Sequence, residues 1–244
     1  MKNTIAFVSI VLLLNLHASA KHYSVLVFYK TAGYHHSSIA AGIKAIMLLG
    51  NEHNFQVDTT ADAAKFTEEN LQQYAAVIFL STTGDVLDDA QQRAFENFIK
   101  SGGGFAGIHS ATDTEYDWSW YGDLVGAYFA DHPDQQEATL NVVNRKTIAT
   151  KHLPKQWTRK DEWYNFKWMT KDKLHVLITI DESSYNAGPS KMGTYHPMSW
   201  YHDFDGGRSF YTELGHTDES YSDPLYLNHL LGGIEYAMGR KKME

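Results

Sequence analysis

The chain has 244 residues, of which 43% are hydrophobic and 20% are charged, and its formal net charge is −8. A chain of this length and hydrophobic content can bury a sizeable core, which excludes a disordered protein. Its acidic balance provides no basic surface, so we expect neither nucleic acid nor a membrane as a partner.

The first twenty residues are typical of a signal peptide. A positive Lys2 precedes an apolar run over 5–16 that is too short to span a bilayer, and Ala-Ser-Ala follows at 18–20. A buried first helix is the alternative interpretation. We therefore predict an exported protein, periplasmic or secreted, with a signal peptide over 1–20 and one domain over 21–244. The sequence contains no Cys, which excludes a lipid-anchored form and disulfides.

Strands and helices alternate in the first half of the domain. Apolar, β-branched and aromatic runs predict strands buried on both faces. These strands lie at 24–29, 55–59, 75–80 and 105–108. One helix should follow Ser37 or Ser38 as its cap and run to about Leu49, and another should begin at Asp88 or Asp89. This order predicts an α/β fold with a doubly wound, mostly parallel sheet, in which ligands bind at the carboxyl ends of the strands.

The second half is less regular and is rich in aromatic loop insertions. Residues 115–170 hold five of the six Trp. We expect strands near 137–143, 175–180, 198–202 and 208–211, and a last helix over about 224–238. The aromatic residues either fill a core or line a pocket for a ring-shaped ligand.

The clearest motif is Gly-Ile-His-Ser-Ala at 107–111, a small-x-X-x-small turn after a predicted strand. Such a turn projects its central side chain above the sheet. Here that residue is His109, which can act as an acid, a base or a metal ligand. Ser110 and Thr112 in the same loop are candidate substrate contacts. A histidine hydrogen-bonded within a turn is the alternative.

A second candidate loop follows the first strand. It contains Tyr34, His35 and His36 before two serines. Adjacent side chains of an extended segment point in opposite directions, so at most one histidine should enter the site. We favour His36, which is nearer the helix, with Tyr34 as a substrate contact. A solvated loop is the alternative interpretation.

A third candidate is the acidic and aromatic run Asp161-Glu162-Trp163-Tyr164. Carboxylates accept hydrogen bonds from sugar hydroxyls and rings stack on sugar faces, so Asp161 and Trp163 are candidate substrate contacts. A carboxyl group beside Trp can have a raised pKa and act as an acid, the role that we assign to Glu162. Taken alone, the run also fits a solvated loop.

Four further histidines are candidates, and two of them, His132 and His196, each precede a proline, at breaks where a side chain can reach a site. The four are His132, His196, His202 and His216. We expect His202 to contact substrate, and His132 with His196 to form a divalent metal site assembled across loops. Scattered core or surface histidines are the alternative. No phosphate-binding glycine motif is present, so we expect no nucleotide cofactor.

With these residues in view, the chain resembles the trehalose-utilisation, ThuA-like family. The matching stretches are VLVFYKTAGYHHSSI, AAVIFLSTTGDVL, GGGFAGIHSATDT, HP at 132–133, DEWYNF, HPMSWYHDFDGGRSFYTELGH and DPLYLNHLLGGIEYA. The resemblance implies a flavodoxin-related fold of the class I glutamine amidotransferase-like type. His109 stands where amidotransferases carry Cys, which excludes glutamine hydrolysis. Where the family often has Phe-Arg-His, this chain has Tyr34-His35-His36, which supports His36.

The resemblance also implies carbohydrate metabolism, with a small-molecule sugar as the partner. The first hypothesis is an exported enzyme that cleaves a keto-glycoside by elimination, with His109 or His36 as the base and Glu162 as the acid. A divalent metal could polarise the ketone. The second is a non-catalytic sugar-binding module, and the third is a metal-dependent hydrolase of another small substrate.

Overall fold

The computed structural model describes residues 23–244, so the predicted signal peptide over 1–20 lies outside the described residues. The described strands are β1 (Ser24–Phe28), β2 (Gln56–Thr60), β3 (Ala76–Leu80), β4 (Gly104–Ile108), β5 (Ala127–Asp131), β6 (Gln136–Val142), β7 (Gln156–Asp161), β8 (Asn165–Met169), β9 (His175–Ile180), β10 (Pro197–Phe204) and β11 (Gly207–Thr212). The described α-helices are α1 (Ile39–His53), α2 (Glu68–Leu71), α3 (Asp89–Lys100), α4 (Ser119–Val125) and α5 (Pro224–Ala237).

Nine of these strands form one mixed sheet in the order β2-β1-β3-β4-β11-β10-β9-β6-β7. The five strands from β2 to β11 are parallel, and each later pairing is antiparallel. Four reversals separate β11 from β7, so β7 again runs in the direction of β1, β4 and β11. The carboxyl ends of these four strands therefore lie at one edge of the sheet, where α/β folds place their ligands.

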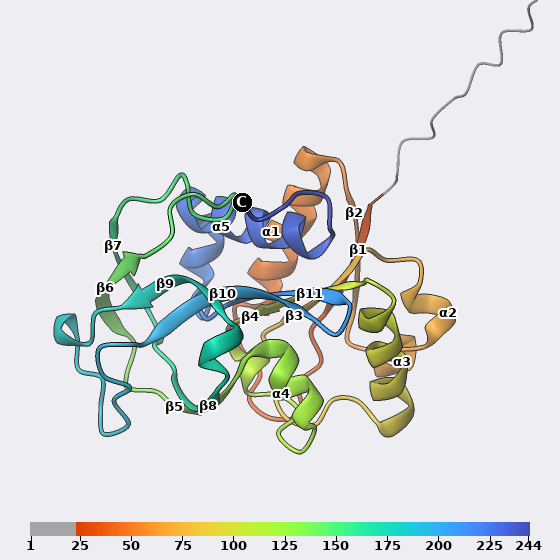
Figure 1. Cartoon of the computed structure of the whole chain (residues 1–244), viewed down its shortest axis with the longest axis horizontal. Coiled ribbons are helices and arrows are strands. Elements are labelled where there is room, and N and C mark those ends of the chain that lie inside the picture. The colour runs from red at the N-terminus through yellow and green to blue at the C-terminus, as the bar shows by residue number, and fades with distance from the viewer. Residues whose placement is uncertain (1–22) are drawn as a thin grey trace, which may run out of the picture.

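Helices cover both faces of the sheet (Figure 1). Val25 and Val27 of β1 pack in one core with α1 and α5, whereas Leu26 and Phe28 pack in a second core with α3 and α4. Successive side chains of a strand point to opposite faces, so a continuous apolar run serves two cores. The predicted doubly wound α/β fold is confirmed.

Most predicted elements lie within one or two residues of their expected positions. Asp88 caps α3 and forms a capping box with Gln91. Ser38 does not cap α1 through its side chain; its hydroxyl donates instead to the carbonyl of Gly215 (3.2 Å). Strands β5, β7 and β8 and helices α2 and α4 are not predicted from the sequence; the two helices have only four and seven residues, and none of the five segments has a clean apolar period.

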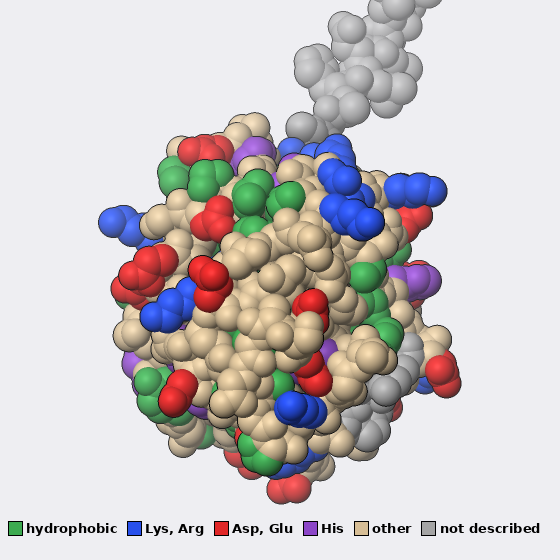
Figure 2. All heavy atoms as spheres, turned by 90° about the vertical axis from the view of Figure 1, so that its left-hand side faces the viewer, with side chains coloured by type: hydrophobic (Ala, Val, Ile, Leu, Met, Phe, Trp, Pro, Cys, Tyr) green, Lys and Arg blue, Asp and Glu red, His purple; other side chains and the backbone are tan. Residues whose placement is uncertain are grey.

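The surface at the antiparallel end of the sheet carries acidic and basic side chains interspersed with one another (Figure 2). Among residues 23–244, no helix has the length and apolar character needed to cross a membrane.

His229 of α5 connects the helix to strands β10 and β11 and to the backbone of Ala149. The ring is fully buried, its Nδ1 donates to the carbonyl of Ala149 (2.8 Å), and its Nε2 lies near the hydroxyls of Ser199 and Thr212. Burial lowers the pKa of His229 to about 4. The folded protein therefore holds this imidazole neutral where the unfolded chain protonates it.

We expect His229 to contribute to acid sensitivity. Its stabilisation is complete above pH 6.5 and is lost as the pH falls toward 4, by about 3 kcal/mol in all. Urea unfolding of the parent and of His229→Gln between pH 7.5 and 4 will measure this. The pH slope of the unfolding free energy reports how many more protons the unfolded state binds than the folded state. In the variant this number should be smaller than in the parent by up to one. Equal slopes would show that His229 titrates alike in both states.

Candidate functional site

Four side chains converge beyond the carboxyl edge of the sheet. They are His36 from the loop after β1, His109 directly after β4, Glu162 directly after β7, and His216 from the loop after β11. One nitrogen or oxygen atom from each lies within 4.8 Å of the others. The three residues to which the sequence assigned acid–base roles are thus in one group, with His216 as its fourth member; we call these four side chains the histidine–glutamate cluster.

His109 reaches the cluster from beneath and is fully buried. Its backbone is left-handed, with φ of 52°, a conformation that non-glycine residues rarely adopt outside constrained sites. Nδ1 lies 2.8 Å from the carbonyl of Glu213. A carbonyl only accepts, so Nδ1 carries the hydrogen and Nε2 presents a lone pair. Nε2 faces Nδ1 of His216 at 3.1 Å and Oε2 of Glu162 at 3.5 Å.

His36 packs edge-on against the rings of His109 and His216, with centroids 4.7 and 5.1 Å away. Its Nδ1 lies 3.3 Å from the hydroxyl of Ser110. Burial, reinforced by the two neighbouring imidazoles, lowers the pKa of His36 to about 2. His36 is therefore neutral at physiological pH and available as a ligand.

Glu162 binds two histidines with different oxygens. Oε2 lies 2.9 Å from Nδ1 of His216, and Oε1 lies 3.2 Å from Nδ1 of His132. Burial alone would raise the pKa of this carboxyl group, but the neighbouring imidazoles of His109 and His216 outweigh it and hold the pKa below its usual range. This corrects the expectation of a raised pKa, since Trp163 points into the core and the histidines surround Glu162 instead.

The neighbouring Asp161 holds the loop that carries His216. Its buried carboxylate accepts from the backbone N–H groups of Gly215 (3.2 Å) and His216 (3.1 Å), and pairs with Arg159 (3.0 Å). These bonds join the end of β7 to the loop after β11. Asp161 is thus a positioning residue rather than a substrate contact.

A cavity of about 380 Å³ opens above the cluster. Its lining residues are Tyr34, His36, Asp113, Phe129, His132, Gln135, Glu162, Tyr164 and His216. The volume is within the range of small-molecule sites. Tyr34 is 66% exposed and stands at the rim, while the rings of Phe129 and Tyr164 are tilted against one another with centroids 4.3 Å apart.

Several predicted contacts lie elsewhere. Ser110 is buried behind His36, and Thr112 bonds the Tyr211 hydroxyl (3.0 Å). Trp163 is buried in the core with its indole N–H donating to the carbonyl of Gln136 (2.9 Å). His202 lies under α4, bonded to the carbonyl of Leu124 (2.9 Å). These side chains point into the core or the turn, so they support the fold and do not line the cavity.

His196 also lies apart from the cluster. Its two ring nitrogens are bonded to the carbonyl of Tyr164 (2.7 Å) and to the carboxylate of Glu182 (3.0 Å). The expected pairing of His132 with His196 at a metal is therefore wrong: His132 contacts Glu162, and His196 has no free nitrogen. The sequence reasoning did not assign roles to His216 and Asp113, although both follow strands that end at the site edge.

The cluster fits a divalent transition metal. A tetrahedral ion at about 2.0–2.1 Å from each ligand places neighbouring ligands about 3.3 Å apart. Three separations among His109, His216 and Glu162 are 3.1, 3.5 and 2.9 Å. The Glu213 carbonyl fixes the His109 tautomer, as an outer-shell partner of a metal-binding histidine does. Three imidazoles and a carboxylate are ligands typical of zinc and related ions.

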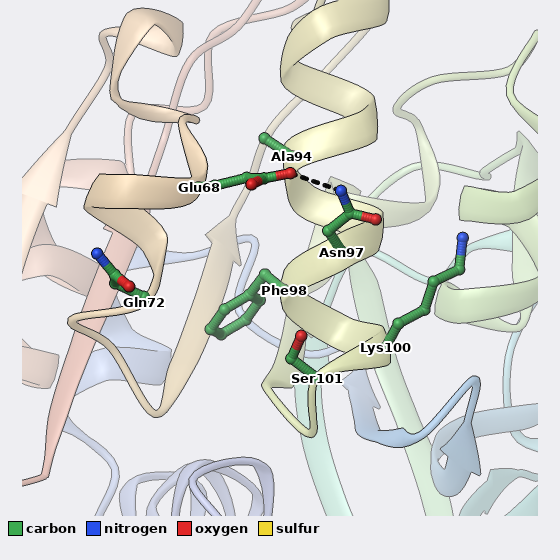
Figure 3. Close-up of a pocket in the computed structure, with 7 residues that line it drawn as sticks. All are labelled: Glu68, Gln72, Ala94, Asn97, Phe98, Lys100 and Ser101. Carbon is green, nitrogen blue, oxygen red and sulfur yellow. Dashed lines mark hydrogen bonds between the residues drawn. The ribbon is translucent and has the colours of Figure 1, made fainter.

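Another hollow lies between α2 and α3 (Figure 3). There the Asn97 amide donates to Glu68 (2.6 Å), and Lys100 extends to Glu96 (2.8 Å). No histidine lines it, and its one carboxyl group, Glu68, is bonded to the Asn97 amide. The cavity above the cluster is therefore the candidate site.

Comparisons with known proteins identify the family and the fold of the chain. The family model described as trehalose utilisation, ThuA, matches residues 24–237. The chain matches no sequence in a curated protein set.

Solved structures share the fold at low sequence identity. A ThuA-like protein from Bacteroides uniformis superposes with a TM-score of 0.76 at 22% identity, over 92% of this chain and 95% of that one. A ThuA-like protein from Parabacteroides merdae gives 0.75 at 20% identity, over 91% of each. A β-galactosidase from Bacillus circulans gives 0.59 at 12% identity, over 89% of this chain and 31% of that one.

Proposed function

Because the chain belongs to the trehalose-utilisation family ThuA, we propose that it is an exported enzyme that cleaves a keto-glycoside, with the histidine–glutamate cluster holding a divalent metal. One observation carries the proposal. Three histidines and a glutamate offer ligand atoms within 4.8 Å of one another, and three of these residues line a cavity of sugar-accommodating size. Export is supported by the signal-peptide pattern over residues 1–20.

When bound, a divalent ion at this cluster would polarise a carbonyl oxygen of the substrate. His36, His109, His216 and Glu162 would hold it. This assignment moves His36, His109 and Glu162 from the acid and base roles expected from sequence to ligand roles. The lowered pKa values of His36 and Glu162 support it, since both groups stay deprotonated at neutral pH.

The rest of the lining suits a sugar. Phe129 and Tyr164 contribute aromatic rings to the cavity wall, and Tyr34 adds an exposed ring at the rim. His132 and Gln135 supply polar groups for hydroxyls. This pattern of rings with a few directed polar groups is usual for small-molecule sites.

A ketone at carbon 3 explains why such a site would cleave a stable glycoside. The ketone acidifies the hydrogen on carbon 2, so that a base can remove it. The electron pair forms the C1=C2 bond as the C1–O bond breaks, and the departing oxygen takes up a proton. Addition of water across C1=C2 then completes a net hydrolysis.

Incubation with 3-keto-trehalose and with trehalose, followed by nuclear magnetic resonance, tests the proposal. We expect the keto-sugar to yield glucose and a keto-hexose, trehalose to stay intact, and a chelator to stop the reaction. Binding of the keto-sugar without turnover, unaffected by His109→Asn, would instead identify a sugar-binding module. If the metal-loaded protein neither binds nor cleaves either sugar, the remaining hypothesis is a hydrolase of another substrate.

A further inference from the structure

Asp113 stands on the wall of the cavity with no role so far. Its backbone is fixed at both polar atoms: the N–H donates to the carbonyl of Ser110 (2.8 Å), and the carbonyl accepts from Gly84 (2.7 Å). The turn that begins at His109 therefore also positions Asp113. Among the described lining residues, Asp113 and Glu162 are the carboxyl groups, and Glu162 is engaged with histidines.

The Asp113 carboxyl group is held in place by a neighbouring hydroxyl group. Oδ1 accepts from the hydroxyl of Tyr116 (2.5 Å), and Lys167 lies over the Tyr116 ring, 5.0 Å from its centroid. The Tyr116 hydroxyl thus orients a carboxyl group that lines the cavity wall. This differs from Glu162, which bonds histidines through both oxygens.

Resting on the keto-glycoside function proposed above, we propose that Asp113 is the catalytic base that removes the carbon-2 proton of the substrate. The Asp113 carboxylate takes that proton, the C1=C2 bond forms, and the C1–O bond breaks with its electron pair on the departing oxygen. That oxygen then receives the proton, which restores the carboxylate. Tyr116 is a positioning residue that holds the carboxyl group.

The surroundings of Asp113 suit this role. Burial raises its pKa above the usual aspartate value, while Tyr116, Lys167, His109 and His132 act to lower it. A base whose pKa is raised toward the working pH binds a proton more readily and still releases it.

The experiment compares Asp113→Asn with Asp134→Asn, an exposed aspartate close to the cavity. Because general base catalysis contributes about 10²–10⁴-fold, we expect Asp113→Asn to lower kcat on 3-keto-trehalose by that factor. KM, metal content and the circular dichroism spectrum should stay near the parent values. Asp134→Asn should match the parent throughout.

Two further readouts separate a base from a merely structural residue. In D₂O the parent should exchange the carbon-2 hydrogen of the substrate, and Asp113→Asn should not. Added formate should restore part of the turnover of Asp113→Ala, because a small carboxylate can occupy the vacated space. If the parent cleaves the keto-sugar and Asp113→Asn keeps full activity or unchanged exchange, the assignment of Asp113 is overturned and the proposed function stands. A metal-loaded parent that does not cleave the keto-sugar overturns both.

Discussion

We expect Asn in place of His36 to empty the proposed metal site, and the same change at the adjacent His35 to leave it filled. His36 is 3% exposed and belongs to the histidine–glutamate cluster. His35 is exposed and contacts only the hydroxyl of Thr31 among the hydrogen bonds of this loop (3.2 Å). Loss of an outer-shell partner alone costs about 10–100-fold in metal affinity, so loss of a ligand should cost more than about 100-fold.

Elemental analysis after dialysis against limiting zinc or manganese will measure this difference. We expect close to one ion per chain in the parent and in His35→Asn, and under about one tenth in His36→Asn. Turnover of 3-keto-trehalose should follow metal content. His109→Asn is a second test, because Asn tolerates the left-handed backbone at φ 52° better than most residues. Equal metal content in all four proteins would show that the cluster is not a metal site.

The fold was predictable because its first half has clear periodicity. The strands at β1, β3 and β4 are continuous apolar runs, and such runs require cover on both faces. Their order then determines which loops share the carboxyl edge, and this places His36 and His109 together. The antiparallel extension was less predictable: β7 reads Gln-Trp-Thr-Arg-Lys-Asp, a polar strand at the edge of the sheet.

The roles of several site residues were misassigned from the sequence for one physical reason. Neighbours in a strand or turn point in different directions, and local sequence does not say which direction faces the ligand. Asp161, Glu162 and Trp163 are consecutive, yet one supports a loop, one faces the cavity and one fills the core. His196 and His202 are buried histidines bonded to carbonyl groups, which the sequence does not distinguish from ligands.

The position of His216 in the cluster could be predicted only in part from the sequence. His216 follows β11, a strand that the sequence predicted near 208–211, but the position of that strand in the sheet was not predicted. Three strands separate β11 from β7 in the sheet, and the hydrogen bonds from Gly215 and His216 to Asp161 connect the loop after β11 to the end of β7 across that distance. Tertiary structure, rather than spacing, therefore assembles the cluster.

Metal binding should also raise the thermal stability of the protein substantially. An ion that binds only the folded chain stabilises it by about 2.7 kcal/mol at a free concentration 100 times its Kd. For a domain of this size each kcal/mol shifts Tm by about 2–4 °C. We therefore expect Tm to fall by about 5–11 °C when a chelator removes the ion, and to recover when zinc or manganese is restored.

Glu162→Gln is the matched control for this shift. The change keeps the size of the side chain but removes the charge that faces His109 and His216. In the metal-free protein the carboxylate is ionised at neutral pH, because its pKa is held below the usual range, so it offers a full negative charge to a cation. Differential scanning calorimetry with and without chelator should give one Tm for Glu162→Gln and two for the parent. The parent should be compared with and without chelator, starting from a metal concentration that saturates turnover. If its Tm is then the same in both, any activating ion binds away from these four side chains.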